Sequence, residues 1–218
     1  MRNFKTTTGA ALGESVKGCR SVGIPLAVLG FLAGLLLSMV QPPPALAQQS
    51  TEIGTLAPAP ADPTTPDEVT LTSRPAAAMR GQSSWDEGYD SLMNAFATLK
   101  GAMGKAGVRV TGAPLATFLE TDDQGFKFEA MLPVDAAPGS RPAGLPAEVT
   151  FGATPAGRAI RFVHRAPYDD IDSTYEAISA YLDSKGIEVK ESFTEEYVQQ
   201  GANAGDMTLD LNIYVQPK

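Results

Sequence analysis

The stretch from Arg161 to Tyr197, RFVHRAPYDDIDSTYEAISAYLDSKGIEVKESFTEEY, contains the pattern that decides the fold. Its first residues are rich in strand formers, and Pro167 can begin a helix because the N–H of a first-turn residue needs no helical partner. Gly186 ends this helix, since glycine tolerates the left-handed conformation of a C-cap, and residues 187–198 predict a second strand. The helix is predicted from apolar residues that recur at the spacing of one helical face: Ile171, Tyr175, Ile178 and Leu182.

The second predicted strand presents a carboxylate between two aromatic rings. Phe193, Glu195 and Tyr197 share one face, because side chains alternate along a strand. A buried carboxylate needs a partner, and a bound cation would also be attracted to the aromatic faces. The alternative is an exposed strand carboxylate, which the neighbouring Glu196 on the opposite face favours.

Residues 68–218 contain two copies of a similar unit, predicted at 68–134 and 148–217. The sequence Glu-Val-Thr begins both copies, at Glu68 and at Glu148, and Phe118 in the first copy corresponds to Tyr197 in the second. Each copy is predicted to form strand, helix, strand and strand, with an additional edge strand at 76–80 in the first. The helix stripe of the second copy also has its counterpart in the first: Leu92, Phe96, Leu99 and Met103.

These patterns predict an α+β fold. Each βαββ unit has one apolar helix stripe and one apolar sheet face, so the helix packs on the sheet. One unit alone would bury little, but two units form a domain of ordinary size. We therefore expect duplicated units related by a pseudo-twofold axis, with antiparallel sheets, helices packed on one face and a cleft between the halves.

The start of the chain, residues 1–47, is interpreted as a signal peptide. A basic beginning precedes an apolar run at 23–40 and the small-x-small sequence Ala45-Leu46-Ala47, which places cleavage after Ala47. The mature protein would then be periplasmic or secreted in a bacterium, without a stable membrane anchor. The alternative is a single N-terminal membrane anchor, since the apolar run is long enough to span a bilayer. Residues 48–67, rich in Ala, Pro and Thr, are expected to form a flexible linker.

Composition disfavours several classes of function. The chain has 17 basic and 25 acidic residues and a net charge of −8, which does not suit nucleic acid. Its single cysteine, Cys19, cannot form an intramolecular disulfide, and its single histidine, His164, excludes a histidine-rich zinc site. We expect no metal and no cofactor. The expected partner is a small organic ligand, while a protein partner is unknown.

Several short motifs in this sequence resemble one family. They are H-R-A-P-Y-D-D at 164–170, Y-E-A-I-S-A-Y-L at 175–182, E-E-Y at 195–197, N-I-Y-V at 212–215 and F-E-A-M-L-P-V at 128–134. In order and in duplication they are similar to the GyrI-like, AraC-type effector-binding domain, over residues 68–218. One departure is Ala166, which stands where the family usually has glycine.

The resemblance implies a duplicated βαββ fold with a ligand cleft between its halves. Family members bind small molecules that are often cationic or amphipathic, and a subset hydrolyses strained, cyclopropane-bearing toxins. Glu195 falls at the family's central acidic position, with Tyr197 after it. Many members are fused to DNA-binding helices, but nothing basic and helical precedes this domain, so we do not carry the regulator function over.

Six residues are candidates for ligand binding: Glu195, Tyr197, Phe193, Phe118, Tyr214 and Trp85. Each aromatic residue also has a structural interpretation. Tyr197, Phe193 and Phe118 could pack across the sheet, Trp85 could close the core, and Tyr214 could meet solvent on the polar face of the last strand. His164 is expected to make a structural hydrogen bond.

Three functions remain open from the sequence. The first is an exported binding module for amphipathic or cationic organic ligands, with Glu195 as counter-charge. The second is a hydrolase of strained electrophiles, in which Glu195 activates water and Tyr197 assists. The third is an envelope protein-interaction domain with an acidic surface. No catalytic residue is assigned outside the hydrolase hypothesis.

Overall fold

The computed structural model describes residues 54–136 and 141–218. The predicted signal peptide at 1–47 lies outside these residues. Within the described ranges, no helix combines the length and the apolar character that a membrane crossing requires. The elements are β1 (Asp67–Leu71), β2 (Pro75–Ser84), α1 (Gly88–Lys105), β3 (Leu115–Asp122), β4 (Gly125–Pro133), β5 (Thr150–Ala153), β6 (Gly157–His164), the 3₁₀ turn η1 (Tyr168–Asp170), α2 (Ile171–Lys185), β7 (Val189–Gln199) and β8 (Asp210–Pro217).

The strands form one antiparallel sheet in the order β1-β6-β8-β7-β3-β4-β2-β5. The predicted α+β class with an antiparallel sheet is therefore confirmed. The strand order reads the same from either edge when β1–β4 are exchanged with β5–β8. This order agrees with the predicted repeat, whereas superposition of the two halves about a pseudo-twofold axis stays a prediction.

Each half contains one strand more than the predicted βαββ unit. Residues 76–80, expected as an additional edge, belong to the ten-residue strand β2, which lies between β4 and β5. Ala76, Ala77 and Ala78 are all buried, because β2 has covered faces on both sides. A run of alanines shows no alternation of polarity, so the sequence predicted a strand here but neither its full length nor its inner position in the sheet.

The two halves of the sheet meet at a short pairing of β3 with β7, which we call the seam. Leu115, Ala116 and Thr117 of β3 pair with residues 194–196 of β7. The hydroxyls of Thr117 and Thr194 also lie 3.0 Å apart, within hydrogen-bonding distance. Both Glu195 and Glu196 therefore lie in the seam, with their side chains on opposite faces of the sheet.

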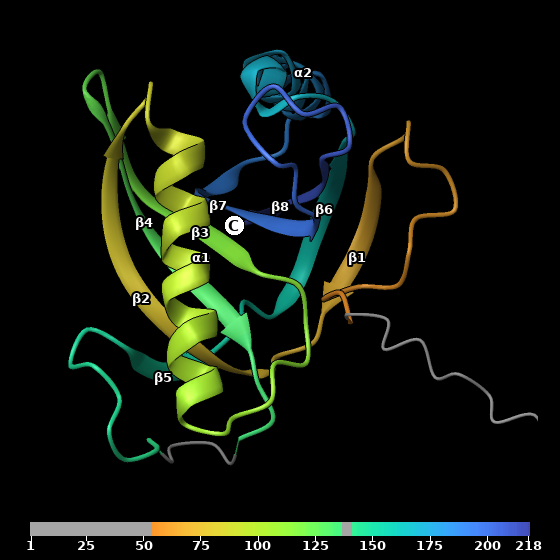
Figure 1. Ribbon diagram of the computed structural model, residues 1–218. Helices are drawn as coiled ribbons and strands as arrows, with labels where there is room; N and C mark the ends of the chain where they lie inside the picture. The colour runs from red at the N-terminus through yellow and green to blue at the C-terminus, as the bar shows by residue number, and fades with distance from the viewer. Residues whose placement is uncertain (1–53, 137–140) are drawn as a thin grey trace, which may run out of the picture. The chain divides into compact units, whose positions relative to one another are not determined.

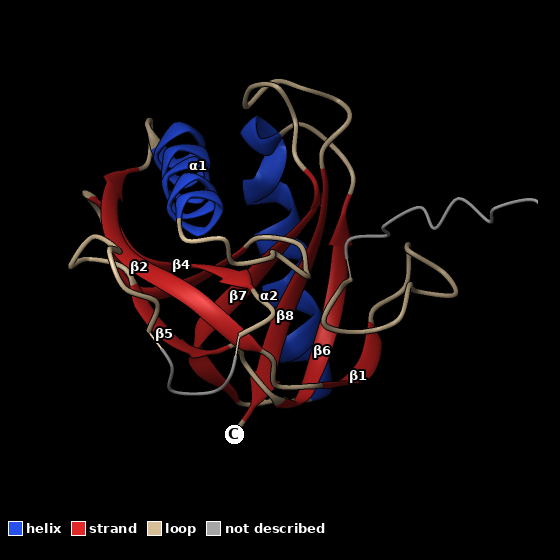
Figure 2. Ribbon diagram, turned by 60° about the horizontal axis from the view of Figure 1, so that its bottom comes forward, coloured by secondary structure: helices blue, strands red, loops and turns tan. Residues whose placement is uncertain are grey.

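Both helices pack on one face of the sheet, and α1 is the more deeply embedded. In Figure 1, α1 runs in front of β2, β3 and β4, while α2 is seen end-on; in Figure 2, β6 and β8 cross in front of α2. Helix α1 buries eight residues, but α2 buries only Ile178 and Leu182. Ile171 and Tyr175, which were expected to be buried, are only half-buried. Tyr175 nevertheless reaches β7, where its ring packs against Phe193.

The opposite face of the sheet carries a second apolar cluster. Residues 54–58, which we call the strap, pack on this face and bury Leu56 and Ala57 against Leu115, Met131 and other residues. This part of the expected flexible linker is therefore bound to the domain. Its composition is that of a linker, but Leu56 supplies an apolar side chain that the sheet can bury.

Candidate ligand-binding site

Glu195 is completely buried at the seam and accepts hydrogen bonds from three tyrosine hydroxyls, which we call the tyrosine cage. Tyr175 donates to Oε1 at 2.8 Å. Tyr197 and Tyr168 donate to Oε2 at 2.6 Å and 3.3 Å. The cleft that was expected at this position is filled by these side chains, so the structure has the carboxylate in a closed site.

Local sequence explains how three separate tyrosines reach one carboxylate. Tyr197 lies two residues after Glu195 on β7 and therefore on the same face. Tyr168 opens η1 and Tyr175 lies in the second turn of α2, directly after it. Across the seam, Glu195 pairs with Ala116, whose small side chain leaves room for the cage.

His164 fixes the beginning of the η1–α2 segment. Its Nε2 lies 3.1 Å from the carbonyl oxygen of Pro167, and its Nδ1 lies 2.8 Å from the hydroxyl of Thr174. Because a carbonyl can only accept, Nε2 donates to Pro167, while the Thr174 hydroxyl is the partner of Nδ1. The expected structural hydrogen bond is thus present, and it holds the segment that carries Tyr168 and Tyr175.

Glu195 is a buried acidic residue, and no basic side chain among the described residues pairs with it. Burial raises the pKa of Glu195, although its three hydrogen bonds act in the opposite direction. Burial, and then the charge of Glu195, raise the pKa of Tyr168, Tyr175 and Tyr197 well above 10, so the tyrosines stay protonated. Glu195 takes part in none of the ion pairs formed by the residues that the structure describes.

Further aromatic rings support the cage from both halves of the domain. Phe193 packs edge-on against Tyr175, with ring centroids 5.7 Å apart. Tyr197 contacts Phe96 of α1, at 5.0 Å between centroids. Tyr168 contacts Tyr89 in the first turn of α1, at 5.2 Å. The cage is therefore lined by rings that belong to α1 on one side and to η1, α2 and β7 on the other.

The structure brings only part of the predicted site together. Glu195, Tyr197 and Phe193 share a face and belong to one cluster, as expected. Phe118 lies on the helix-facing side but packs against Phe126, at 5.1 Å between ring centroids. Trp85, 53% exposed, also packs against Phe126 and donates to a backbone carbonyl of the β3–β4 turn.

Tyr214 is separated from Glu195 by the sheet itself. It is buried on the opposite face, where its hydroxyl donates to Glu196 at 2.7 Å. Neighbouring strand residues alternate between faces, and Tyr214 pairs with Thr194 rather than with Glu195. It therefore cannot belong to the same ligand site as the tyrosine cage.

Sequence reasoning missed two of the three cage tyrosines. Tyr168 was noted only as part of a motif, and Tyr175 was assigned to the apolar stripe of the helix. A usable signal existed, because a tyrosine on the buried stripe of a helix needs an acceptor for its hydroxyl. The carboxylate of Glu195, which was expected to line a ligand cleft or to be exposed, is that acceptor.

The raised pKa of Glu195 predicts that this residue lowers stability at neutral pH. A carboxyl group whose pKa is higher in the folded protein binds a proton more readily when folded, so stability falls as pH rises from the ordinary pKa near 4.5 through the raised value. Glutamine does not titrate. The free energy of unfolding of Glu195→Gln, relative to wild type, should therefore rise with pH across this window and level off above it. Urea denaturation at several pH values measures this difference, and a difference that is flat or falls with pH would contradict it.

Comparison with known proteins identifies the family. The family model of the GyrI-like small molecule binding domain matches residues 64–218. The chain belongs to the GyrI-like family. This match confirms the resemblance seen in the motifs and shows that the described domain is of a small-molecule-binding kind. No curated protein matches the sequence.

Solved structures similar to this GyrI-like domain share its fold. The C-terminal domain of EcmrR has a TM-score of 0.57 and 16% identity, over 71% of this chain and 97% of that one. A hydrolase from Listeria innocua has a TM-score of 0.52 and 10% identity, over 72% of this chain and 94% of that one. At such identities the likeness concerns the fold alone.

The EcmrR–DNA complex bears on the prediction about nucleic acid. EcmrR in that complex has a TM-score of 0.57 and 16% identity over 71% of this chain, which spans 57% of the length of the EcmrR chain. The exclusion of nucleic acid, which we drew from net charge, is therefore not supported, since a similar structure is part of a DNA-bound protein.

Proposed function

We propose that this GyrI-like protein is an exported binding module for amphipathic organic cations, with Glu195 as the counter-charge. The observation that carries the proposal is a fully buried carboxylate that is held only by tyrosine hydroxyls. An uncompensated buried charge is costly, so a protein without a use for it would be more stable with a neutral residue. A cationic ligand would supply the missing partner. Export rests on the sequence of residues 1–47.

The surrounding rings support an aromatic or amphipathic ligand. Tyr168, Tyr175 and Tyr197 present ring faces as well as hydroxyls, and Phe96 and Phe193 pack behind them. A cation over such faces gains attraction from the ring quadrupoles, and more so when water is excluded. Apolar parts of the ligand would gain further from burial. Charge selectivity would then come from Glu195, and most of the affinity from the rings.

The η1–α2 segment is the part that would move to admit a ligand. It supplies two of the three cage hydroxyls, and α2 buries only two residues, against eight for α1. As whole residues, Tyr168 and Tyr175 are only half-buried, although their hydroxyls lie inside the closed site. Elements with few buried contacts are the ones that open most readily. Displacement of this segment away from α1 would uncover Glu195.

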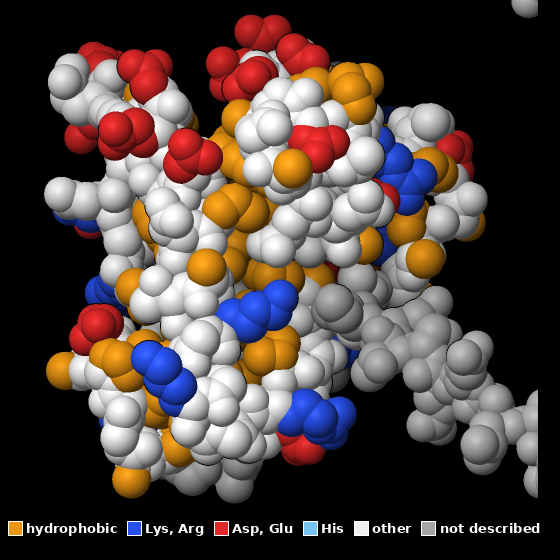
Figure 3. Space-filling view, in the orientation of Figure 1, with side chains coloured by type: hydrophobic (Ala, Val, Ile, Leu, Met, Phe, Trp, Pro, Cys, Tyr) orange, Lys and Arg blue, Asp and Glu red, His pale blue; other side chains and the backbone are white. Residues whose placement is uncertain are grey.

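The surface near the cage also favours cations. Acidic side chains gather at the end of the domain where β2 ends and the β3–β4 turn lies, and near the start of α2 (Figure 3). This distribution would raise the local concentration of a cation near Tyr168. The exposed acidic residues on these segments include Asp86, Glu87, Asp90, Asp122, Asp123, Asp169 and Asp170.

A matched pair of dyes tests the proposal. The purified protein is titrated with crystal violet, a triarylmethane cation, and with its neutral leuco form, while thermal stability is recorded. The cation should raise the melting temperature progressively as its concentration increases, because a ligand of the folded state must stabilise it. The neutral form should have a much smaller effect. Equal shifts with both dyes would contradict a role for charge, and no shift with either would contradict the proposal.

A second candidate is hydrolysis of a strained electrophile. The observation that favours it is the raised pKa of Glu195, since a general base works best when its pKa lies near the working pH. Tyr197, whose hydroxyl donates to the carboxylate at 2.6 Å, would assist by holding it in position. Turnover of a cyclopropane-bearing compound that disappears in Glu195→Gln would establish this function. Stoichiometric binding without product would contradict hydrolysis and support the binding module instead.

A further inference from the structure

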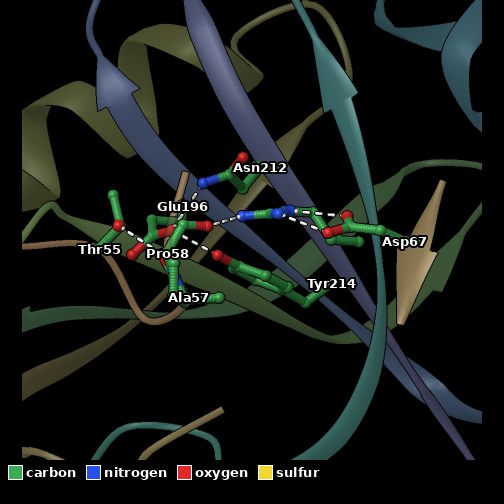
Figure 4. Close-up of polar contacts among 8 residues, drawn as sticks. Thr55, Ala57, Pro58, Asp67, Glu196, Asn212 and Tyr214 are labelled. Atoms are coloured by element: carbon green, nitrogen blue, oxygen red, sulfur yellow. Dashed lines mark hydrogen bonds and ion pairs between the residues drawn. The ribbon is translucent and has the colours of Figure 1, made fainter. Parts of the chain in front are cut away.

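A second buried glutamate lies directly behind the first. Glu196 is 1% exposed, and both of its carboxylate oxygens are engaged. Oε1 accepts the backbone N–H of Leu56 in the strap at 2.6 Å. Oε2 accepts from Asn212 at 2.9 Å and from Tyr214 at 2.7 Å. Figure 4 shows these three side chains converging beside Thr55 and Ala57 of the strap.

The strap is bonded to both halves of the sheet. On the side of the first half, the N–H of Ala113 donates to the carbonyl of Gly54 at 3.1 Å, and Arg74 donates to the carbonyl of Thr55 at 2.8 Å. On the side of the second half, Glu196 of β7 binds the N–H of Leu56, and Arg161 of β6 donates to the carbonyl of Pro58. Arg161 is itself buried and held by Asp67 in a two-bond ion pair.

The strap therefore crosses the seam, where the pairing of β3 with β7 is short. Only three residues of β3 pair with β7, and Glu195 and Glu196 are two of their partners. Rotation of one half against the other would change the spacing of the anchor points on the strap. On the helix-facing side, the same rotation would separate α1 from the tyrosine cage, because Phe96 and Tyr89 of α1 contact Tyr197 and Tyr168.

We propose that the strap is a clasp, anchored by Glu196, that holds the two halves together across the seam and so limits the opening of the tyrosine cage on the other face. The role of the clasp in ligand access rests on the proposed function, whereas its role in the seam does not. Since coupling between two sites is reciprocal, loosening the strap favours the open site, and a ligand that opens the site loosens the strap.

Hydrogen exchange followed by mass spectrometry tests the clasp. In Glu196→Gln, one amide oxygen cannot accept from Leu56, Asn212 and Tyr214 together. Exchange should rise by roughly tenfold in the strap, as expected for loss of one charged hydrogen bond, and it should also rise in the seam segments 114–118 and 193–197. Glu191→Gln removes the same charge from an exposed position on β7 and should change neither region.

A second pair of variants keeps the test decisive if Glu196→Gln does not fold. Arg74→Ala removes the bond to Thr55 from the other half, and its matched control is Arg80→Ala, whose side chain is 78% exposed and pairs with Glu129. Faster exchange in the strap alone would show that the strap only covers this face locally, and would contradict its proposed role in holding the two halves together. Unchanged exchange in the strap would overturn the anchoring role of Glu196 or, in the second pair, of Arg74.

Crystal violet provides the ligand arm of the same experiment. Saturating dye should increase exchange of the strap amides in the wild-type protein. A dye that binds and leaves the strap unchanged would overturn the coupling. A dye that does not bind at all would contradict the proposed function, while exchange in the dye-free variants would still decide whether the strap holds the seam.

Discussion

Glu195→Gln should lower the affinity for an aromatic cation by roughly tenfold or more, and should leave the affinity for a neutral molecule of similar shape nearly unchanged. The estimate follows from losing a charged partner, which is worth about 1.5–3 kcal/mol. Glutamine keeps the size of the side chain, and tyrosine hydroxyls can accept as well as donate. The cage can therefore remain intact while its charge is removed, so a loss of affinity reports on charge.

Isothermal titration calorimetry with crystal violet and its leuco form measures the effect. The control is Glu191→Gln, exposed on the same strand, which should bind both dyes like the wild type. Glu196→Gln is unsuitable as a control although Glu196 lies on the opposite face of β7, because the strap and β8 cover Glu196 and both of its oxygens accept hydrogen bonds.

The same substitution should have opposite effects on binding and on stability. Because burial raises the pKa of Glu195, the glutamine variant is expected to gain stability at neutral pH while it loses affinity for the cation. A variant that loses affinity by unfolding would lose both. Equal losses for Glu195→Gln and Glu191→Gln, or an equal loss for both dyes, would show that Glu195 is not the counter-charge of the ligand.

The sequence predicted those features that depend on periodicity. The stripe that contains Ile178 and Leu182 identified α2, and the alternation in β7 placed Glu195 and Tyr197 on one face. These signals are local, because a helix or strand repeats its buried face at a fixed spacing. The order of motifs also indicated the family correctly.

The sequence did not predict features that depend on contacts between distant segments. The buried state of Glu196 requires the strap, which is 140 residues away in the chain, and strap residues have the composition of a linker. Tyr175 looked like a core residue because a stripe shows which face is buried but not which hydroxyl finds an acceptor. Tyr214 looked like a neighbour of the site because the face of β8 relative to β7 is set by their register.

The packing of α2 gives a second prediction with a large effect. Ile178 is 1% exposed and is one of only two buried residues of this helix. Ile178→Ala should reduce the free energy of unfolding by roughly 2–5 kcal/mol, because it removes buried carbon atoms and leaves a cavity. Urea denaturation measures the loss. The matched control is Leu119→Ala on β3, 38% exposed, for which we expect a change within about 0.5 kcal/mol.

The two helices should differ in which part of the structure opens when a buried residue is truncated. Leu99 is fully buried on α1, and seven other residues of this helix are also buried. Truncating Leu99 to alanine should therefore leave α1 protected from hydrogen exchange up to global unfolding. With Ile178 truncated, α2 retains Leu182 alone and should open separately, at a lower free energy than the rest of the domain. Because α2 carries Tyr175 of the cage, this local opening would also expose Glu195. If Ile178→Ala costs no more than Leu119→Ala, or if α2 and α1 lose protection together, α2 is not the weakly held element that ligand access requires.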